Sequence, residues 1–326
     1  MIAAACLLLV FAAAGSGETV LLDGKAMEAA KLPDTVPKGV REAAVRLEPW
    51  GEKHKIRIHL SEKEPILLAV PAGFANATPM LQELKASRDD YLQRFAAPLP
   101  ADDVFEVVYV ESKEAYTAYV DDLVARQEYL KGWAAGAKET AGFWLHRPLA
   151  AAYYRNTKDP KEKSAEFNVR NQLVHQFGHL LANSTLGRQP YWIQEAIAWS
   201  LEQARENTIY AFCHRSGFVF KKEHGGWPKL GKGYVASNGA AALDKIFAMD
   251  RNGEIPKEVG AGAMALADQL ASKHKEAFAK FLAALRADFD AKNGDPNYKI
   301  ALDKQKEMFT AAFGAGALKS IPGEMH

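Results

Sequence analysis

Two histidines one helical turn apart are the residues of this chain best suited to chemistry. His175 and His179 lie in the segment N-Q-L-V-H-Q-F-G-H-L-L, which runs from Asn171 to Leu181. On a helix, residues four apart share one face and lie about 6 Å apart along the axis, so both imidazoles can bind one metal ion. The apolar neighbours predict a buried helix. A metal ion is one way to satisfy two buried imidazoles.

The spacing alone is not specific. Nine histidines in 326 residues produce an H-x-x-x-H match by chance in roughly one of four such sequences, and two core or surface histidines on an amphipathic helix have the same pattern. A second segment favours a metal site. Pro190 is a favoured helix start, and the following W-I-Q-E-A-I-A-W segment places Glu195 among apolar residues, where a carboxylate usually faces a cation. Two histidines and one glutamate form a three-ligand zinc site with a fourth position open.

These two segments resemble the active site of the gluzincins, zinc metallopeptidases of the H-E-x-x-H type. Their third ligand is a glutamate on a second helix, often within W-x-x-E-G-x-A, and Trp192 to Ala198 follows this pattern. Within the clan, the chain is most similar to the bacterial peptidase MA-like domains. The likeness covers roughly residues 65 to 205. It implies a zincin-like metallopeptidase fold, a peptide or protein as substrate or ligand, and zinc held by His175, His179 and Glu195.

Two residues depart from the family pattern. Ala196 replaces the glycine after the ligand glutamate and is small enough for close helix packing. Gln176 occupies the position of the catalytic glutamate, which takes a proton from the attacking water and passes it to the leaving amine. An amide has no proton equilibrium near pH 7, and loss of a positioned base typically costs about 10²- to 10⁴-fold in rate. The missing negative charge should make hydroxide easier to form at the metal, but the amine still lacks its proton donor. We expect zinc binding to persist and efficient peptide hydrolysis to be lost.

Other polar residues near the motif are candidates to replace the missing base or to stabilise an intermediate. Glu202 is seven residues after Glu195 on the same helix face, but two turns from the metal, so we interpret it as a solvated or structural charge. We interpret the remaining candidates as structural. They are His146, on the hairpin before the motif, and Tyr210, His214, His224 and Tyr234, after it.

Three hypotheses follow. The first is a zinc-loaded gluzincin with impaired hydrolysis that acts by binding peptides or proteins. The second is an active zinc hydrolase that uses another base or a substrate easier to cleave than an amide. The third is a structural protein without metal that retains the helix pair.

The elements that position these residues follow from the hydrophobic pattern. We expect strands over residues 55–60, 65–70 and 104–110, a hairpin over 142–154 that folds at Arg147-Pro148, and helices over 77–95 and 112–134, the second capped by Ser112. Residues 18–53 contain prolines that interrupt long elements, and 206–258 are predicted to be irregular. Helices are expected over 263–274, 276–289 and 298–313. Strands that do not alternate with crossover helices predict an α+β fold, strand-rich in its N-terminal half and helical in its C-terminal half.

The chain divides into four predicted segments. Residues 1–17 are a signal peptide, 18–64 an N-terminal extension and 65–205 the zincin-like catalytic-type domain. Residues 206–326 are a mostly helical part of the same fold or a subdomain. The signal peptide is predicted from the apolar run between Met1 and Ala14, although no Lys or Arg precedes Lys25; a buried N-terminal helix is the alternative. We therefore expect a secreted or periplasmic protein.

Composition excludes several other classes of protein. A formal net charge of +1 provides no basic field for nucleic acid, and no second apolar segment is long enough to span a membrane. Cys6 lies in the predicted signal peptide, so its removal leaves Cys213 as the only thiol and excludes an intrachain disulfide. Cys213 is interpreted as a small buried hydrophobe.

Overall fold

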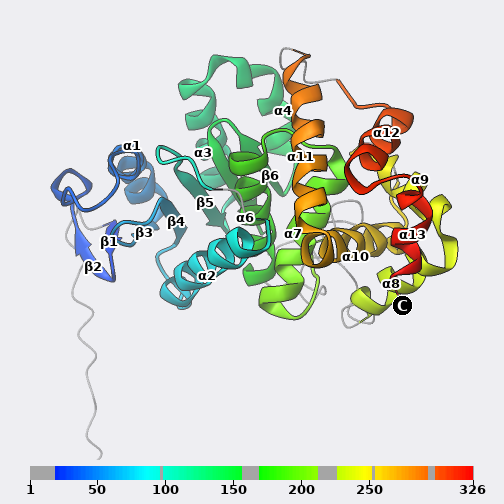
Figure 1. Cartoon of the computed structure of the whole chain (residues 1–326). Helices are drawn as coiled ribbons and strands as arrows, with labels where there is room; N and C mark the ends of the chain where they lie inside the picture. Colours follow the sequence, from blue (N-terminus) through cyan, green and yellow to red (C-terminus); the bar gives the residue numbers. More distant parts are fainter. Residues whose placement is uncertain are drawn as a thin grey trace, which may run out of the picture.

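A mixed sheet dominates the N-terminal half of the chain (Figure 1). The computed structural model describes residues 19–95, 98–155, 169–211, 226–251, 254–292 and 298–325. Within them the sheet has seven strands in the order β2-β1-β3-β4-β5-β7-β6. The strands are β1 (Val20–Leu22), β2 (Lys25–Met27), β3 (Ile56–Leu60), β4 (Ile66–Pro71), β5 (Phe105–Val110), β6 (Gly142–His146) and β7 (Leu149–Tyr154). The three predicted strands and the hairpin are confirmed, and β6 forms one edge of the sheet.

Every described element after Tyr154 is a helix, so the expected helical C-terminal half is confirmed in the described residues, as is the α+β class. The α-helices are α1 (Lys38–His54), α2 (Ala77–Phe95), α3 (Lys113–Arg126), α4 (Lys131–Glu139), α6 (Val169–Leu186), α7 (Tyr191–Glu206), α8 (Trp227–Asn238), α9 (Ala240–Phe247), α10 (Lys257–Lys273), α11 (Lys275–Asp290), α12 (Leu302–Phe313) and α13 (Ala317–Gly323). Ser112 caps α3 as predicted, by accepting a hydrogen bond from the Ala115 amide. The predicted continuous helix over 112–134 is wrong, because the backbone is extended at Gln127 and the chain restarts in α4.

The two faces of the sheet belong to two hydrophobic cores. Along β4, Ile66 and Leu68 face a core formed with α2, α6 and the C-terminal helices, whereas Leu67 and Ala69 face a core formed with α1, α3 and α4. This alternation is the two-residue period of a strand that is buried on both sides. The arrangement has three layers, and α6 lies against the face that carries the larger core (Figure 1).

The predicted N-terminal extension belongs to the sheet. β1, β2 and β3 lie within residues 18–64, and β3 pairs with β4 across the expected boundary at residue 65. The prediction that prolines interrupt this region is also wrong for α1. Pro37 precedes the helix and Pro49 lies inside it. A proline there removes one hydrogen bond, but burial of a face that includes Val40, Leu47 and Trp50 against the sheet compensates for the loss.

The region predicted to be irregular, 206–258, contains two helices, α8 and α9. Gly231 of this region and Gly262 of α10 lie where α8 and α10 touch. A Cβ on Gly231 in α8 would lie 2.0 Å from the carbonyl oxygen of Ala261 in α10, and a Cβ on Gly262 would lie 2.8 Å from the Tyr234 ring. These glycines therefore permit a close helix crossing instead of breaking the chain into loops.

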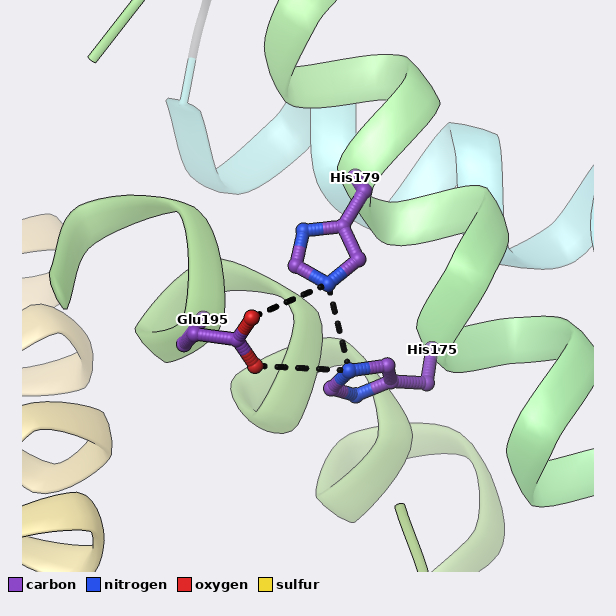
Figure 2. Close-up of side chains that lie close together, drawn as sticks. All are labelled: His175, His179 and Glu195. Carbon is purple, nitrogen blue, oxygen red and sulfur yellow. Dashed lines mark hydrogen bonds and ion pairs between the residues drawn. The ribbon is translucent and has the colours of Figure 1, made fainter. Parts of the chain in front are cut away.

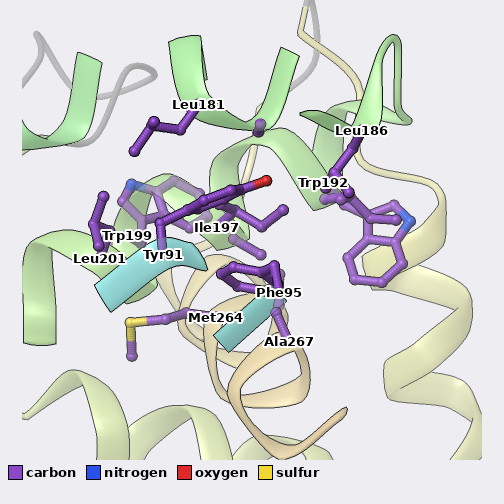
Figure 3. Close-up of a cluster of buried hydrophobic side chains, with 14 of the residues drawn as sticks. Tyr91, Phe95, Leu181, Leu186, Trp192, Ile197, Trp199, Leu201, Met264 and Ala267 are labelled. Atoms are coloured by element: carbon purple, nitrogen blue, oxygen red, sulfur yellow. The ribbon is translucent and has the colours of Figure 1, made fainter. Parts of the chain in front are cut away.

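The helices after residue 206 share their core with the motif helices. Figure 3 shows Tyr91 and Phe95 of α2, Trp192 and Trp199 of α7, and Met264 of α10 in one cluster. In this common core, α6 and α7 pack between the sheet and the helices that follow residue 206.

Several sequence-based predictions lie outside the described residues. They concern the predicted signal peptide with Cys6, and Cys213, His214 and His224. Among the residues that the structure describes, no helix is long and apolar enough to cross a bilayer.

Candidate metal centre

The two motif helices run antiparallel. Asn171, near the start of α6, donates a hydrogen bond to Glu202, late in α7, at 2.8 Å. At the other end, Asn183 and Gln194 exchange two amide hydrogen bonds of 3.3 Å. The connecting turn includes Gly187 at φ +67°, a conformation that favours glycine. This antiparallel pairing brings the middle of α6 against the first half of α7.

Gly178 sets the distance between the two helices. A Cβ at this position would lie 3.0 Å from the Cα of Ala198 on α7. Ala196, the small residue expected to allow close packing, is fully buried. The close approach lets Glu195 reach both histidines, so Gly178, between the two histidines, contributes to the site although sequence reasoning did not single it out.

The structure brings His175, His179 and Glu195 together as predicted (Figure 2). The Nε2 atoms of the two histidines lie 3.2 Å apart. His175 Nε2 is 3.5 Å from Glu195 Oε2, and His179 Nε2 is 3.6 Å from Glu195 Oε1. The side chains of both histidines are 0% exposed and that of Glu195 is 1% exposed. Three potential ligand atoms thus face one another in a site closed to bulk water.

These separations suit a single metal ion. For metal–ligand bonds of about 2.0–2.1 Å, two ligand atoms lie roughly 3.3 Å apart around a tetrahedral ion and roughly 2.9 Å apart at adjacent positions of an octahedral one. The observed 3.2, 3.5 and 3.6 Å are closer to the tetrahedral value. The triad could therefore hold a metal ion.

The ionisation of the triad also suits a cation. Burial lowers the pKa of His179 to about 3; Glu195 opposes this shift, while His175 and the positive charge of Arg251 add to it. Burial alone would raise the pKa of the Glu195 carboxyl, but His179, His175 and a hydrogen bond from Tyr191 lower it to about 2. At neutral pH, His179 is therefore an uncharged imidazole and Glu195 a carboxylate, the forms that bind metal.

Of the two interpretations of Glu202, the structure excludes a solvated charge and leaves a structural one. Its side chain is 0% exposed and therefore not solvated, and its Oε2 lies 3.3 Å from Nδ1 of His175. The Asn171 side chain and the Ala211 amide also donate hydrogen bonds to its Oε1. Glu202 lies two turns after Glu195 on α7. Because α7 runs antiparallel to α6, Glu195 faces Nε2 of the His175 ring and Glu202 faces its opposite edge, at Nδ1. A carboxyl group on Nδ1 directs Nε2 toward the metal position and fixes the ring.

Replacing Glu202 with glutamine is expected to weaken metal binding about 10- to 100-fold, because the amide is a weaker acceptor for the imidazole N–H. Competition with a chromophoric chelator of known affinity measures the change. Glu206→Gln on the same helix is the control, since Glu206 pairs with Arg170 and not with a histidine of the triad. Equal affinities for the two variants would show that Glu202 does not support His175.

Gln176, which the sequence resemblance assigns to the position of a catalytic base, is 5% exposed. Its Oε1 is buried and accepts no hydrogen bond from any residue that the structure describes. An amide oxygen left without a donor is costly in a protein interior. Gln176 is thus a buried neighbour of His175 in the chain, with hydrogen-bonding capacity that the described residues do not use.

Two contacts of the triad were not predicted. Trp144 of β6 stacks on His179, with ring centroids 4.7 Å apart and an interplanar angle of 20°. Tyr191 donates a hydrogen bond to Glu195. Tyr191 lies four residues before Glu195 on the same helix face, which is a usable signal; Trp144 is far away in the sequence and has none.

The remaining candidates occupy different places. His146 is exposed at the end of β6. The Tyr210 amide donates a hydrogen bond to Glu202, so its backbone supports the site. Tyr234 packs against Gly262 of α10.

No protein-family model matches the chain, and comparison with curated proteins finds no significant match. The resemblance to gluzincins is therefore an expectation from the motif residues alone.

Proposed function

We propose that this chain is an exported zinc-binding protein of the gluzincin type, which binds peptides and hydrolyses them poorly or not at all. The observation that carries the proposal is the buried triad of His175, His179 and Glu195, in which three ligand atoms converge from two antiparallel helices. A metallopeptidase-like fold is part of the proposal.

Zinc is the proposed ion because of the ligand set. Two imidazole nitrogens and one carboxylate are typical ligands of catalytic zinc sites, and the spacing of the three atoms fits tetrahedral coordination. When bound, zinc supplies a Lewis acid that polarises a carbonyl group and lowers the pKa of water.

Peptide binding is supported by the position of the triad beside the sheet. β6 pairs only with β7 among the described strands, which leaves its outer backbone edge unpaired. Trp144 of this strand contacts His179 directly. An extended peptide can add to such an edge through main-chain hydrogen bonds, and here it would run beside the metal ligands.

Weak hydrolysis follows from the groups available to move a proton. Gln176 can orient a water molecule through its amide, but it cannot accept the proton. Glu202 does not replace the base, because it lies on the Nδ1 side of His175, whereas the metal position lies on the Nε2 side. Glu195 faces both histidines as a ligand.

Peptide binding to the purified mature chain tests this function. With zinc present, a fluorescein-labelled peptide pool should raise fluorescence anisotropy and remain largely uncleaved, as judged by mass spectrometry. Treatment with 1,10-phenanthroline should reduce the binding, since loss of the ion would disturb the triad that Trp144 of the β6 edge contacts. Binding that is absent with zinc present, or rapid cleavage by the wild type, would contradict the proposal.

A further inference from the structure

A large cleft lies beside the metal centre. Its volume is about 1880 Å³, and its walls include the β6–β7 hairpin, the turn between α6 and α7, and the segment after α9. Trp144 and Tyr191 line this cleft and also contact the triad, Trp144 by stacking on His179 and Tyr191 by hydrogen bonding to Glu195. A ligand that contacts Trp144 or Tyr191 is therefore separated from the triad by one side chain.

Three arginines from separate segments line this part of the cleft. Arg147 lies in the hairpin turn, Arg188 between α6 and α7, and Arg251 after α9. All three share the cleft with Trp144 and Tyr191, the two residues that contact the triad, and Arg147 directly follows β6, three residues after Trp144.

Two of these charges have no partner in the described part of the chain. Arg147 and Arg251 form no ion pair with any residue that the structure describes, and both are exposed. Arg188 is held in position, because its Nη2 donates to the Tyr298 carbonyl at 2.8 Å and its guanidinium lies 4.6 Å from the Phe289 ring centre.

Five of the six acidic residues that line the cleft have partners of their own, and Asp102 is the one without an ion pair or a side-chain hydrogen bond among the described residues. Asp250, next to Arg251 in sequence, pairs with Lys299, and Asp290 pairs with Arg286 at 3.5 Å. Glu106 pairs with Arg46 at 2.6 Å, and Asp103 accepts a hydrogen bond from Ser184. None of the acidic groups of the cleft pairs with Arg147 or Arg251 among the described residues, so both charges are available to a ligand.

We propose that this cleft binds peptides through a carboxylate, either the C-terminus or an acidic side chain, which Arg147 and Arg251 hold beside the metal centre. Guanidinium groups bind carboxylates through paired, charge-assisted hydrogen bonds, which give geometric specificity as well as attraction. The inference rests on the proposed peptide-binding function and specifies its ligand class.

The test compares peptides that differ only in charge. Zinc-loaded full chain is titrated against one labelled peptide with glutamates and a free C-terminus, against its amidated form, and against its Glu-to-Gln form. Wild type is expected to prefer the acidic peptides about 10- to 100-fold, and added salt should reduce the preference. The amidated and Glu-to-Gln peptides distinguish the C-terminal carboxylate from the side-chain carboxylates.

Paired variants assign the preference to the two arginines. The double variant Arg147→Ala/Arg251→Ala should lose the preference while retaining zinc and its unfolding temperature, because both side chains are exposed. Arg286→Ala, in the same cleft but paired with Asp290, should keep it. Equal binding of all peptides by zinc-loaded wild type, or an unchanged preference in the double variant, would overturn this inference alone. A chain that binds neither zinc nor any peptide would overturn it together with the proposed function.

Discussion

Replacing Gln176 with glutamate is expected to raise zinc-dependent peptide hydrolysis about 10²- to 10⁴-fold. Gln176 follows His175 on α6, and in the proposed gluzincin-type site it stands where a catalytic glutamate would be expected. Its amide oxygen already lies buried without a donor among the described residues. A carboxylate of the same length there can accept a proton from the attacking water and return it to the leaving amine.

Cleavage of a quenched fluorescent peptide, with and without 1,10-phenanthroline, measures this gain. Gln172→Glu is the matched control, because Gln172 is also a nearly buried glutamine on α6 with an unpaired Oε1. It should gain nothing. If the wild type already cleaves the peptide and Gln176→Glu is no faster, the impaired-enzyme interpretation is wrong and the hypothesis of an active hydrolase with another base takes its place.

Removal of the metal is expected to lower the thermal unfolding midpoint by on the order of 10 °C. A ligand present at about 1,000 times its Kd stabilises the folded state by about 4 kcal/mol, and each kcal/mol shifts the midpoint of a domain of this size by about 2–4 °C. The loss of stability comes from the triad. In the chelated chain, the buried carboxylate of Glu195 faces His175 and His179 and has no cation to contact.

Differential scanning fluorimetry of the zinc-loaded and chelated chain measures this shift. His179→Ala is the control, since a chain that cannot hold the ion should unfold at the same temperature with and without chelator. A wild-type midpoint that does not respond to chelator would mean that the triad is stable without metal, as the hypothesis of a metal-free structural protein requires.

The convergence of the triad was predictable because its signals are local. His175 and His179 are one turn apart on a helix, and Glu195 is a carboxylate inside an apolar helical segment. For Glu202, the sequence left a solvated and a structural charge open, because the choice between them depends on the relative direction of two helices. Trp144 reaches His179 from an edge strand of the sheet, a contact that no local pattern encodes.

The errors in the predicted secondary structure have a similar cause. Pro49 and Gly231 are strong local signals for interrupted structure, yet both lie inside helices. In α1, an apolar face packed on the sheet outweighs the proline, and in α8, the glycine allows contact with the Ala261 backbone. At such positions, the secondary structure depends on packing partners far away in the sequence, and these partners are visible only in the folded core.

Metal analysis of the purified, dialysed chain tests the central claim most directly. Inductively coupled plasma mass spectrometry should find about one zinc per wild-type chain and none in the His179→Ala variant, with Glu206→Gln unchanged. Wild type without metal, iron in place of zinc, or equal zinc in wild type and the His179→Ala variant would contradict a zinc centre formed by His175, His179 and Glu195.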